Sequence, residues 1–237
     1  MQKAMPSSIG LWCEAFIDSM KDNKSLILKI LQHIDQSPMG TGAGYGLPIV
    51  VDRDLTAQLL KFHKIQKNPI YVQNSRGKFE STILHGLNQI MLDLNKMSSD
   101  ILLFSMSEMG YVELPFEICT GSSIMPHKKN PDVLEIIRAN YHKMTSLEFQ
   151  IKSVISNLPS GYNRDIQLTK EPTIKAFEVT KENLKIMKTV IEQLKVNETN
   201  CKEAMVDELY ATYEVYDLVE QGVTFRDAYK KISNKYE

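Results

Sequence analysis

The residues best suited to chemistry lie in one polar stretch, residues 121–132, which reads Gly-Ser-Ser-Ile-Met-Pro-His-Lys-Lys-Asn-Pro-Asp. A glycine and two serines, Ser122 and Ser123, favour a mobile loop whose hydroxyls can approach a ligand closely. Two lysines follow, and then a helix start with Asn130 as the expected N-cap and Pro131 as the expected first helical residue. Cations, free backbone N–H groups and a helix dipole in one place suit an anion and favour a nearby hydroxyl as a base. An ordinary interhelical loop would use the same residue types, so both interpretations stay open at this point.

Four long segments must position this loop, and they carry the apolar pattern of long helices. Their apolar residues step alternately by four and three, which is close to a coiled-coil heptad. The segments cover residues 9–34, 83–101, 133–158 and 177–194, and strand-type alternation over a useful length is missing. Helices of about 20–28 residues joined by loops predict an all-α fold. The expected architecture is an elongated antiparallel bundle of long helices.

Individual positions make this prediction testable. The fourth apolar seam comprises Phe177, Thr180, Leu184, Met187, Ile191 and Leu194. Asn23 and Asn140 interrupt the first and third seams, where they either fix the register of packing or lie in solvent. Helical patterns become shorter after about residue 197. We therefore expect a central bundle domain at residues 1–197 and the start of a small helical C-terminal domain at residues 198–237.

The composition argues against several classes of protein. With 28 basic and 29 acidic residues the formal net charge is −1, so neither nucleic acid nor an anionic membrane is an expected partner. The three cysteines, Cys13, Cys119 and Cys201, lie far apart and form no paired motif. A disulfide framework or a zinc site is therefore not expected, and a reducing cytoplasm fits.

The polar stretch resembles the signature loop of the fumarase/aspartase superfamily, Gly-Ser-Ser-x-Met-Pro-x-Lys-x-Asn-Pro, and has every fixed residue of that pattern. Within the superfamily, residues 128–132, Lys-Lys-Asn-Pro-Asp, resemble argininosuccinate lyases, because fumarases and aspartases usually have Gly before the first lysine and Val after it. Residues 162–171, Tyr-Asn-Arg-Asp-Ile-Gln-Leu-Thr-Lys-Glu, are similar to a second element of the argininosuccinate lyases.

A third similarity lies in the glycine-rich loop that follows the first long segment. Residues 38–43, Pro-Met-Gly-Thr-Gly-Ala, resemble the family's Pro-Leu-Gly-Ser-Gly-Ala loop, with Thr in place of Ser. Asp52 and Arg53 fall where the family has an Asp-Arg pair, which we expect to form a local ion pair that fixes the loop. The resemblance thus covers nearly the whole chain.

The resemblance implies a reaction without metal or organic cofactor, in which argininosuccinate is split into arginine and fumarate. A base removes a proton from the carbon next to a carboxylate, and the β substituent then leaves. By motif position, the implied catalytic residues are Ser122 as the base, Lys128, and Glu135, which orients a histidine acid. The implied substrate-binding residues are Ser123, Asn130, Tyr162, Gln167 and Lys170. Fixed cations and donors would stabilise the dianionic carboxylate that forms.

The resemblance also implies a larger assembly than this chain. Family members have a helical domain ahead of the bundle, and the histidine acid would lie immediately before Met1, since residues 2–6 are similar to the continuation of the family's Thr-His-x-Gln element. We therefore expect a fragment of a longer protein, also cut short in its C-terminal domain and inactive by itself. Family members are homotetramers whose active sites each combine loops from three chains, and we expect the same here.

Other functions stay open. Adenylosuccinate lyase also has a lysine-rich signature loop, although residues 162–171 favour argininosuccinate. A non-catalytic structural relative, as the δ-crystallins are, would share the fold, although Ser122, Lys128, Asn130 and Glu135 argue against lost activity. A generic coiled-coil assembly protein would explain the apolar seams but not the polar loops.

Overall fold

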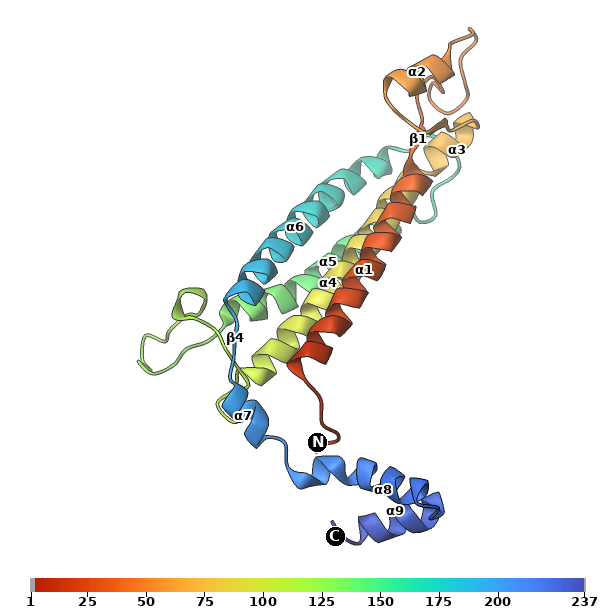
Figure 1. The fold of residues 1–237 in the computed structure, drawn as a ribbon. Helices are drawn as coiled ribbons and strands as arrows, with labels where there is room; N and C mark the ends of the chain where they lie inside the picture. The colour runs from red at the N-terminus through yellow and green to blue at the C-terminus, as the bar shows by residue number, and fades with distance from the viewer. Residues whose placement is uncertain (1–2, 237) are drawn as a thin grey trace.

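The computed structural model describes residues 3–236, so Gln2, where the similarity of residues 2–6 begins, lies outside the described part. Helices α1 (Ile9–Ile34), α4 (Lys78–Phe104), α5 (Asp132–Val154) and α6 (Lys170–Gln193) lie side by side in an elongated bundle (Figure 1). Successive helices of the bundle run in opposite directions, which confirms the predicted all-α antiparallel bundle. No helix in the described part of the chain combines the length and the apolar character that a membrane crossing requires.

Short elements connect the long helices and follow them. The short helices are α2 (Arg53–Leu59), α3 (Pro69–Asn74), η1 (Phe116–Ile118), η2 (Arg164–Thr169), α7 (Glu198–Glu203), η3 (Asp207–Tyr210), α8 (Ala211–Glu220) and α9 (Phe225–Ser233). Strand β1 (Gln36–Ser37) pairs in parallel with β2 (Lys64–Ile65), and β3 (Val112–Glu113) pairs antiparallel with β4 (Lys195–Val196). These two-residue strands were not predicted, because two residues are too few to show an alternation. They tie together loops at the two ends of the bundle.

The core of the bundle centres on α4 and α5. Leu84, Met91 and Ile101 of α4 are fully buried in one cluster with Ile137 and Met144 of α5. Each such side chain contributes roughly 1.5–3 kcal/mol through burial. These buried side chains lie on the facing sides of α4 and α5, which therefore form the centre of the bundle.

Polar side chains fix the register between neighbouring helices. Asn23 of α1, which is 8% exposed, donates through Nδ2 to Oδ2 of Asp93 on α4 at 2.6 Å, and the Ser19 hydroxyl donates to the same oxygen at 2.6 Å. Asn140 of α5 donates to Oδ1 of Asn183 on α6 at 3.2 Å. The two asparagines that interrupt the seams therefore link helices, and they do so within one chain.

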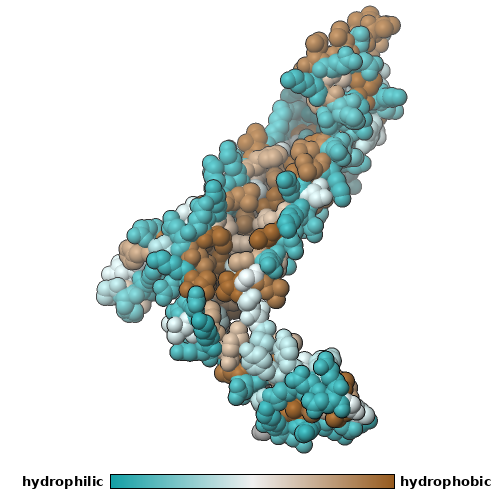
Figure 2. All heavy atoms as spheres, in the orientation of Figure 1, coloured by the Kyte–Doolittle hydropathy of each residue, from teal (hydrophilic) through white to brown (hydrophobic). Residues whose placement is uncertain are grey.

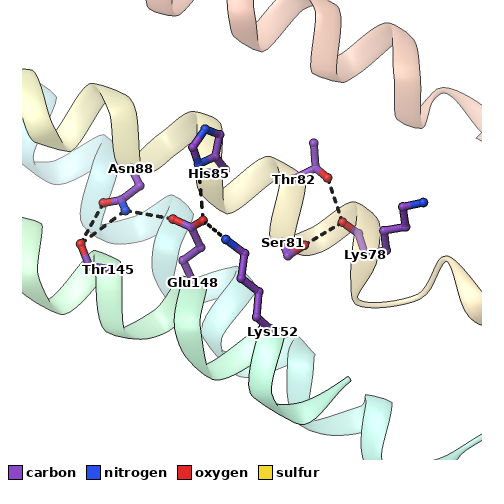
Figure 3. A network of polar contacts seen from close by, with 8 residues as sticks. All are labelled: Lys78, Ser81, Thr82, His85, Asn88, Thr145, Glu148 and Lys152. Carbon is purple, nitrogen blue, oxygen red and sulfur yellow. Dashed lines mark hydrogen bonds and ion pairs between the residues drawn. The ribbon is translucent and has the colours of Figure 1, made fainter. Parts of the chain in front are cut away.

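A second group of polar side chains links α4 to α5 (Figure 3). It lies toward the end of the bundle where α4 begins and α5 ends, called the far end below. The carboxylate of Glu148, 7% exposed, accepts hydrogen bonds from Asn88 at 2.9 Å and from Lys152 at 2.5 Å, and it lies 3.4 Å from Nδ1 of His85. Burial disfavours the charged carboxylate, but these hydrogen bonds and the charges of Lys152 and His85 outweigh it. The pKa of Glu148 is therefore lowered.

Helix α6 corrects the predicted fourth seam. Its buried face consists of Pro172, Ala176, Val179, Thr180, Asn183, Met187 and Val190. Thr180 and Met187 of the predicted seam are buried, but its Phe177, Leu184 and Ile191 are 40–48% exposed. Helix α6 carries two apolar rows, and packing against α5 and α4 selects the row of smaller side chains, which allows a closer approach. The other row is left on the surface.

A second, small core lies in the helical hairpin of α8 and α9. Val215, Ala228 and Ile232 are buried together. Thr224 caps α9, because its Oγ1 accepts a hydrogen bond from the N–H of Asp227 at 3.3 Å. The hairpin packs its own apolar side chains, which is in line with a separate C-terminal unit, while the domain boundary at residue 197 stays a prediction.

Candidate active site

Residues 121–129, called the serine loop below, leave the bundle ahead of α5 and are largely exposed. Ser122 is partly buried, and its Oγ accepts hydrogen bonds from the backbone N–H groups of Ile124 at 3.3 Å and Met125 at 3.2 Å. Two donors aimed at one hydroxyl oxygen stabilise negative charge on that oxygen more than they stabilise the neutral hydroxyl. Once Ser122 has lost its own hydroxyl proton, this geometry suits its oxygen to accept a proton from a carbon acid.

The start of α5 differs from the predicted cap. The helix begins at Asp132 with Pro131 in the N-cap position, and no side chain caps it. Asn130 instead pairs its backbone with Thr120, with N–H to C=O distances of 2.8 and 2.9 Å. This pairing takes up the N–H and C=O of Asn130 outside the helix, so the helix starts two residues later than Asn130. The positive end of the α5 dipole faces the serine loop without a side-chain cap.

A cavity of about 680 Å³ lies between the base of the serine loop, the end of α4 and β3. Asn130 and Glu135 line it, together with Lys129 and His127 of the loop. Ser122, Ser123 and Lys128 are not among the lining residues and lie on the outer part of the loop. The structure thus brings two of the predicted residues to one cavity and leaves three on the loop beside it.

Cys119 also lines this cavity. Burial raises the pKa of its thiol, with the carboxylates of Asp132 and Glu117 acting in the same direction and the charge of Lys129 opposing them. A thiol with a raised pKa stays protonated and is a poor nucleophile. Cys119 therefore acts as part of the wall.

The remaining predicted residues lie beyond the other end of α5. Tyr162 is 45% exposed, and the guanidinium of Arg76 lies 5.3 Å from the centre of its ring. A hydrogen bond with Arg164 lowers the pKa of Tyr162 against a smaller opposing effect of burial, and the charges of both arginines lower it further. Gln167, in η2, is partly buried, and Lys170 is exposed at the start of α6. This cluster of cations and polar donors suits carboxylates.

Two further loops are fixed at this same end. Asn74, at the end of α3, accepts a hydrogen bond from the N–H of Gly161 at 2.9 Å and donates to Oγ of Ser160 at 3.1 Å. Asp52 and Arg53 do not form the predicted ion pair in the described structure. Asp52 caps α2, while Arg53 donates to backbone carbonyls, those of Met39 at 2.8 Å and Gln66 at 2.7 Å among them. A guanidinium with several fixed donors holds a glycine-rich loop better through its carbonyls than through one adjacent carboxylate.

The predicted site residues therefore form two groups at opposite ends of the bundle (Figure 1). Helix α5 separates them, and its 23 residues span about 34 Å at 1.5 Å per residue. A small substrate cannot touch both groups in one chain. Arg76 was not predicted as a neighbour of Tyr162, because the two are 86 positions apart and share no local pattern.

Known structures establish the fold class. EDDS lyase in complex with formate superposes with a TM-score of 0.86 at 22% identity, covering 97% of this chain and 46% of that one. Class II fumarase from Schistosoma mansoni gives a TM-score of 0.79 at 18% identity, covering 98% and 56%. The bundle with its serine loop thus has the fold of the fumarase-type lyases.

Sequence relatives establish the family. A family profile described as "Lyase" matches residues 1–144, which is more than half of the chain, and the chain belongs to this family. The argininosuccinate lyase of Thermotoga neapolitana is 49% identical over 99% of this chain, which spans 59% of that protein's length. The argininosuccinate lyase of Phocaeicola vulgatus is 40% identical over 98% of this chain, which spans 52% of it. The resemblance found in the sequence is confirmed at the level of the family.

Proposed function

We propose that this chain forms the serine-loop part of an argininosuccinate lyase, which splits argininosuccinate into arginine and fumarate. The names of relatives up to 49% identical over nearly the whole chain support the substrate. The observation that carries the chemistry is the oxygen of Ser122, which accepts two backbone N–H groups.

The reaction needs a base, a cation-rich pocket and an acid. Ser122, as the alkoxide, takes the proton from the carbon next to the reacting carboxylate. The electron pair left on carbon passes first into that carboxylate, which becomes a dianion, and Lys128 and Asn130 stabilise the added charge. The pair then forms the double bond of fumarate as the carbon–nitrogen bond breaks. The nitrogen of the leaving arginine takes a proton from an acid, which Glu135 orients.

The far group of residues supplies substrate binding in this proposal. Tyr162, Gln167 and Lys170 hold the carboxylates, and Ser123 assists from the serine loop. Because α5 keeps the two groups about 34 Å apart, each active site takes its serine loop and its far group from different copies of the chain. We propose a homotetramer, as in the family that the sequence resembles.

The surface of the bundle supports such an assembly. Figure 2 shows apolar side chains along the middle of the bundle, and exposed large apolar residues occur on both α1 and α6. Leu11 is 61% exposed and Ile174 is 60% exposed. Apolar area of this kind on long helices favours association with other helices. We place the assembly in the cytoplasm, in line with the three free cysteines.

The proposal is tested by following fumarate absorbance with the intact protein. Argininosuccinate should give turnover, while adenylosuccinate and EDDS (ethylenediaminedisuccinate) should give little. Turnover of one of the other substrates in preference would assign a different lyase of the same fold. No turnover of any substrate, with a folded tetramer, would favour a structural role.

A further inference from the structure

A backbone pair between Thr120 and Asn130, called the clasp below, joins the two ends of the serine loop, and no motif position predicts it. Thr120 and Asn130 exchange both backbone hydrogen bonds, at 2.8 and 2.9 Å. Together they enclose residues 121–129, so the loop can move only between two paired ends. An isolated pair of this kind is weak by itself, because water competes for both partners at an exposed position.

A side-chain contact reinforces the pair. The hydroxyl of Thr120 donates a hydrogen bond to Oδ2 of Asp132, the first residue of α5. The carboxylate of Asp132 lies at the N-terminal end of the helix, where the dipole stabilises negative charge. Leu134 and Ile137 anchor this turn, since both are fully buried in the core. The hydroxyl of Thr120 thus connects the base of the exposed serine loop to the first turn of α5.

We infer that Thr120 is a positioning residue for the reaction, acting through Asp132 and the backbone of Asn130. This inference rests on the proposed function for its effect on catalysis, but the clasp itself does not. The contact holds Asn130 at the cavity and keeps the serine loop within reach of it. The loss of the contact leaves Ser122 and Lys128 chemically intact and lowers the fraction of time in which they are placed to react.

The test compares Thr120→Val with Thr120→Ser in the intact protein. Valine keeps the shape of threonine and removes only the hydroxyl, whereas serine keeps the hydroxyl. We expect Thr120→Val to lower kcat about tenfold with KM within about twofold, and Thr120→Ser to restore kcat to within about twofold of the parent. Thr189→Val, at an exposed position of α6, is the matched control and should leave both constants unchanged.

A second measurement reads the clasp without relying on activity. Lys128 and Lys129 make the serine loop a substrate for trypsin, and amide exchange reports the pairing of Thr120 with Asn130. Thr120→Val should speed cleavage at these lysines and exchange of residues 120–130 by about tenfold, while Thr120→Ser should match the parent. If the parent protein has no lyase activity but this pattern appears, the proposed function is wrong and the clasp stands.

Asp132→Ala completes the experiment as a double-mutant cycle. Because both side chains act through one contact, Thr120→Val combined with Asp132→Ala should speed cleavage no more than either change alone. Additive effects, or equal cleavage rates for Thr120→Val and the parent, would overturn the inference. So would a loss of kcat in Thr120→Ser as large as that in Thr120→Val, because the hydroxyl would then be irrelevant.

Discussion

The two ends of the bundle carry the two halves of the predicted site and are built differently. At the far end, the guanidinium of Arg53 ties the glycine-rich loop to the segment before α3, and the amide of Asn74 ties the end of α3 to Ser160 and Gly161. At the other end, the serine loop is exposed over almost its whole length and is held mainly at its base. The proposed binding groups thus sit on a scaffold of side-chain contacts, while the proposed base sits on an exposed loop.

The difference fits the demands of an elimination reaction. Carboxylates are held best by donors with fixed directions, since orientation is part of the binding energy. The proposed base must come close to a carbon and then withdraw to release products, which a loop does more readily than a helix. The predictions below test this contrast, beginning with the largest expected effect.

Ser122→Ala should lower kcat by about 10³-fold in the intact protein, because the proposed proton acceptor is lost while the proposed binding groups at the far end, called the fixed end below, stay in place. Steady-state kinetics by fumarate absorbance measures this. Ser146→Ala, at an exposed position of α5, is the control and should keep full activity. Unchanged turnover in Ser122→Ala would remove this serine from the mechanism and leave the family assignment intact.

Mixing two inactive variants should restore activity if the two ends act in trans. Ser122→Ala damages one end and Lys170→Met the other, so a mixed assembly contains some sites with both ends intact. Unfolding and refolding the variants together should give several-fold more turnover than either variant alone, whereas refolding each variant separately should give no increase in turnover. An absence of recovery, with mixed assemblies present by mass, would place both groups in one chain's site.

Glycine substitutions should separate the two ends by stability. Gly77, at the fixed end, has φ +77°, and an added Cβ would overlap Cγ2 of Ile155. Gly77→Ala should therefore reduce the free energy of unfolding by about 2–3 kcal/mol. Gly121, in the serine loop, has only a carbonyl 3.9 Å from such a Cβ, and Gly121→Ala should change it by less than about 0.5 kcal/mol. Urea unfolding at one protein concentration measures both, and equal losses would contradict the contrast.

The network around Glu148 should make the fixed end sensitive to acid. Because its pKa is lowered in the folded chain, its stabilisation is complete above its ordinary value of 4.5 and is lost as pH falls through the lower folded value. Glu148→Gln should cost about 1–2 kcal/mol at pH 7 and flatten the decline between about pH 5 and pH 3. Glu182→Gln, at an exposed position of α6, should leave the profile unchanged. A decline in Glu148→Gln as steep as in the parent would exclude this network as its source.

Asn140→Ala should have the smallest effect and reduce the free energy of unfolding by about 0.5–1 kcal/mol, because it leaves the side-chain oxygen of the buried Asn183 without this donor. Thermal unfolding should show a lower midpoint with no change in kcat, since the contact lies between helices. A loss of activity without a loss of stability would mean that register at this point controls the site.

Long-range periodicity predicted the long helices well, and short elements escaped it. The apolar pattern predicts the first helix at residues 9–34, and α1 has these same bounds, with Ser8 as its cap. The pattern predicts that the third helix reaches residue 158, but α5 ends at Val154, ahead of the positive φ of Asn157 and of Pro159. Helices α2 and α3 were missed because six or seven residues show no clear period, although Asp52 and Asn68 gave a cap signal that could have located them.

By itself the sequence determined the long helices and predicted the chemistry of the site, since both depend on residues within a few positions of one another. The serine loop, its lysines and the helix that follows can be read from twelve consecutive residues. Only the tertiary structure decided which apolar row of α6 faces inward, that Thr120 reaches Asp132, and that α5 holds the two groups of site residues apart. These outcomes depend on burial and contacts summed over segments far apart in the chain, which no local pattern contains.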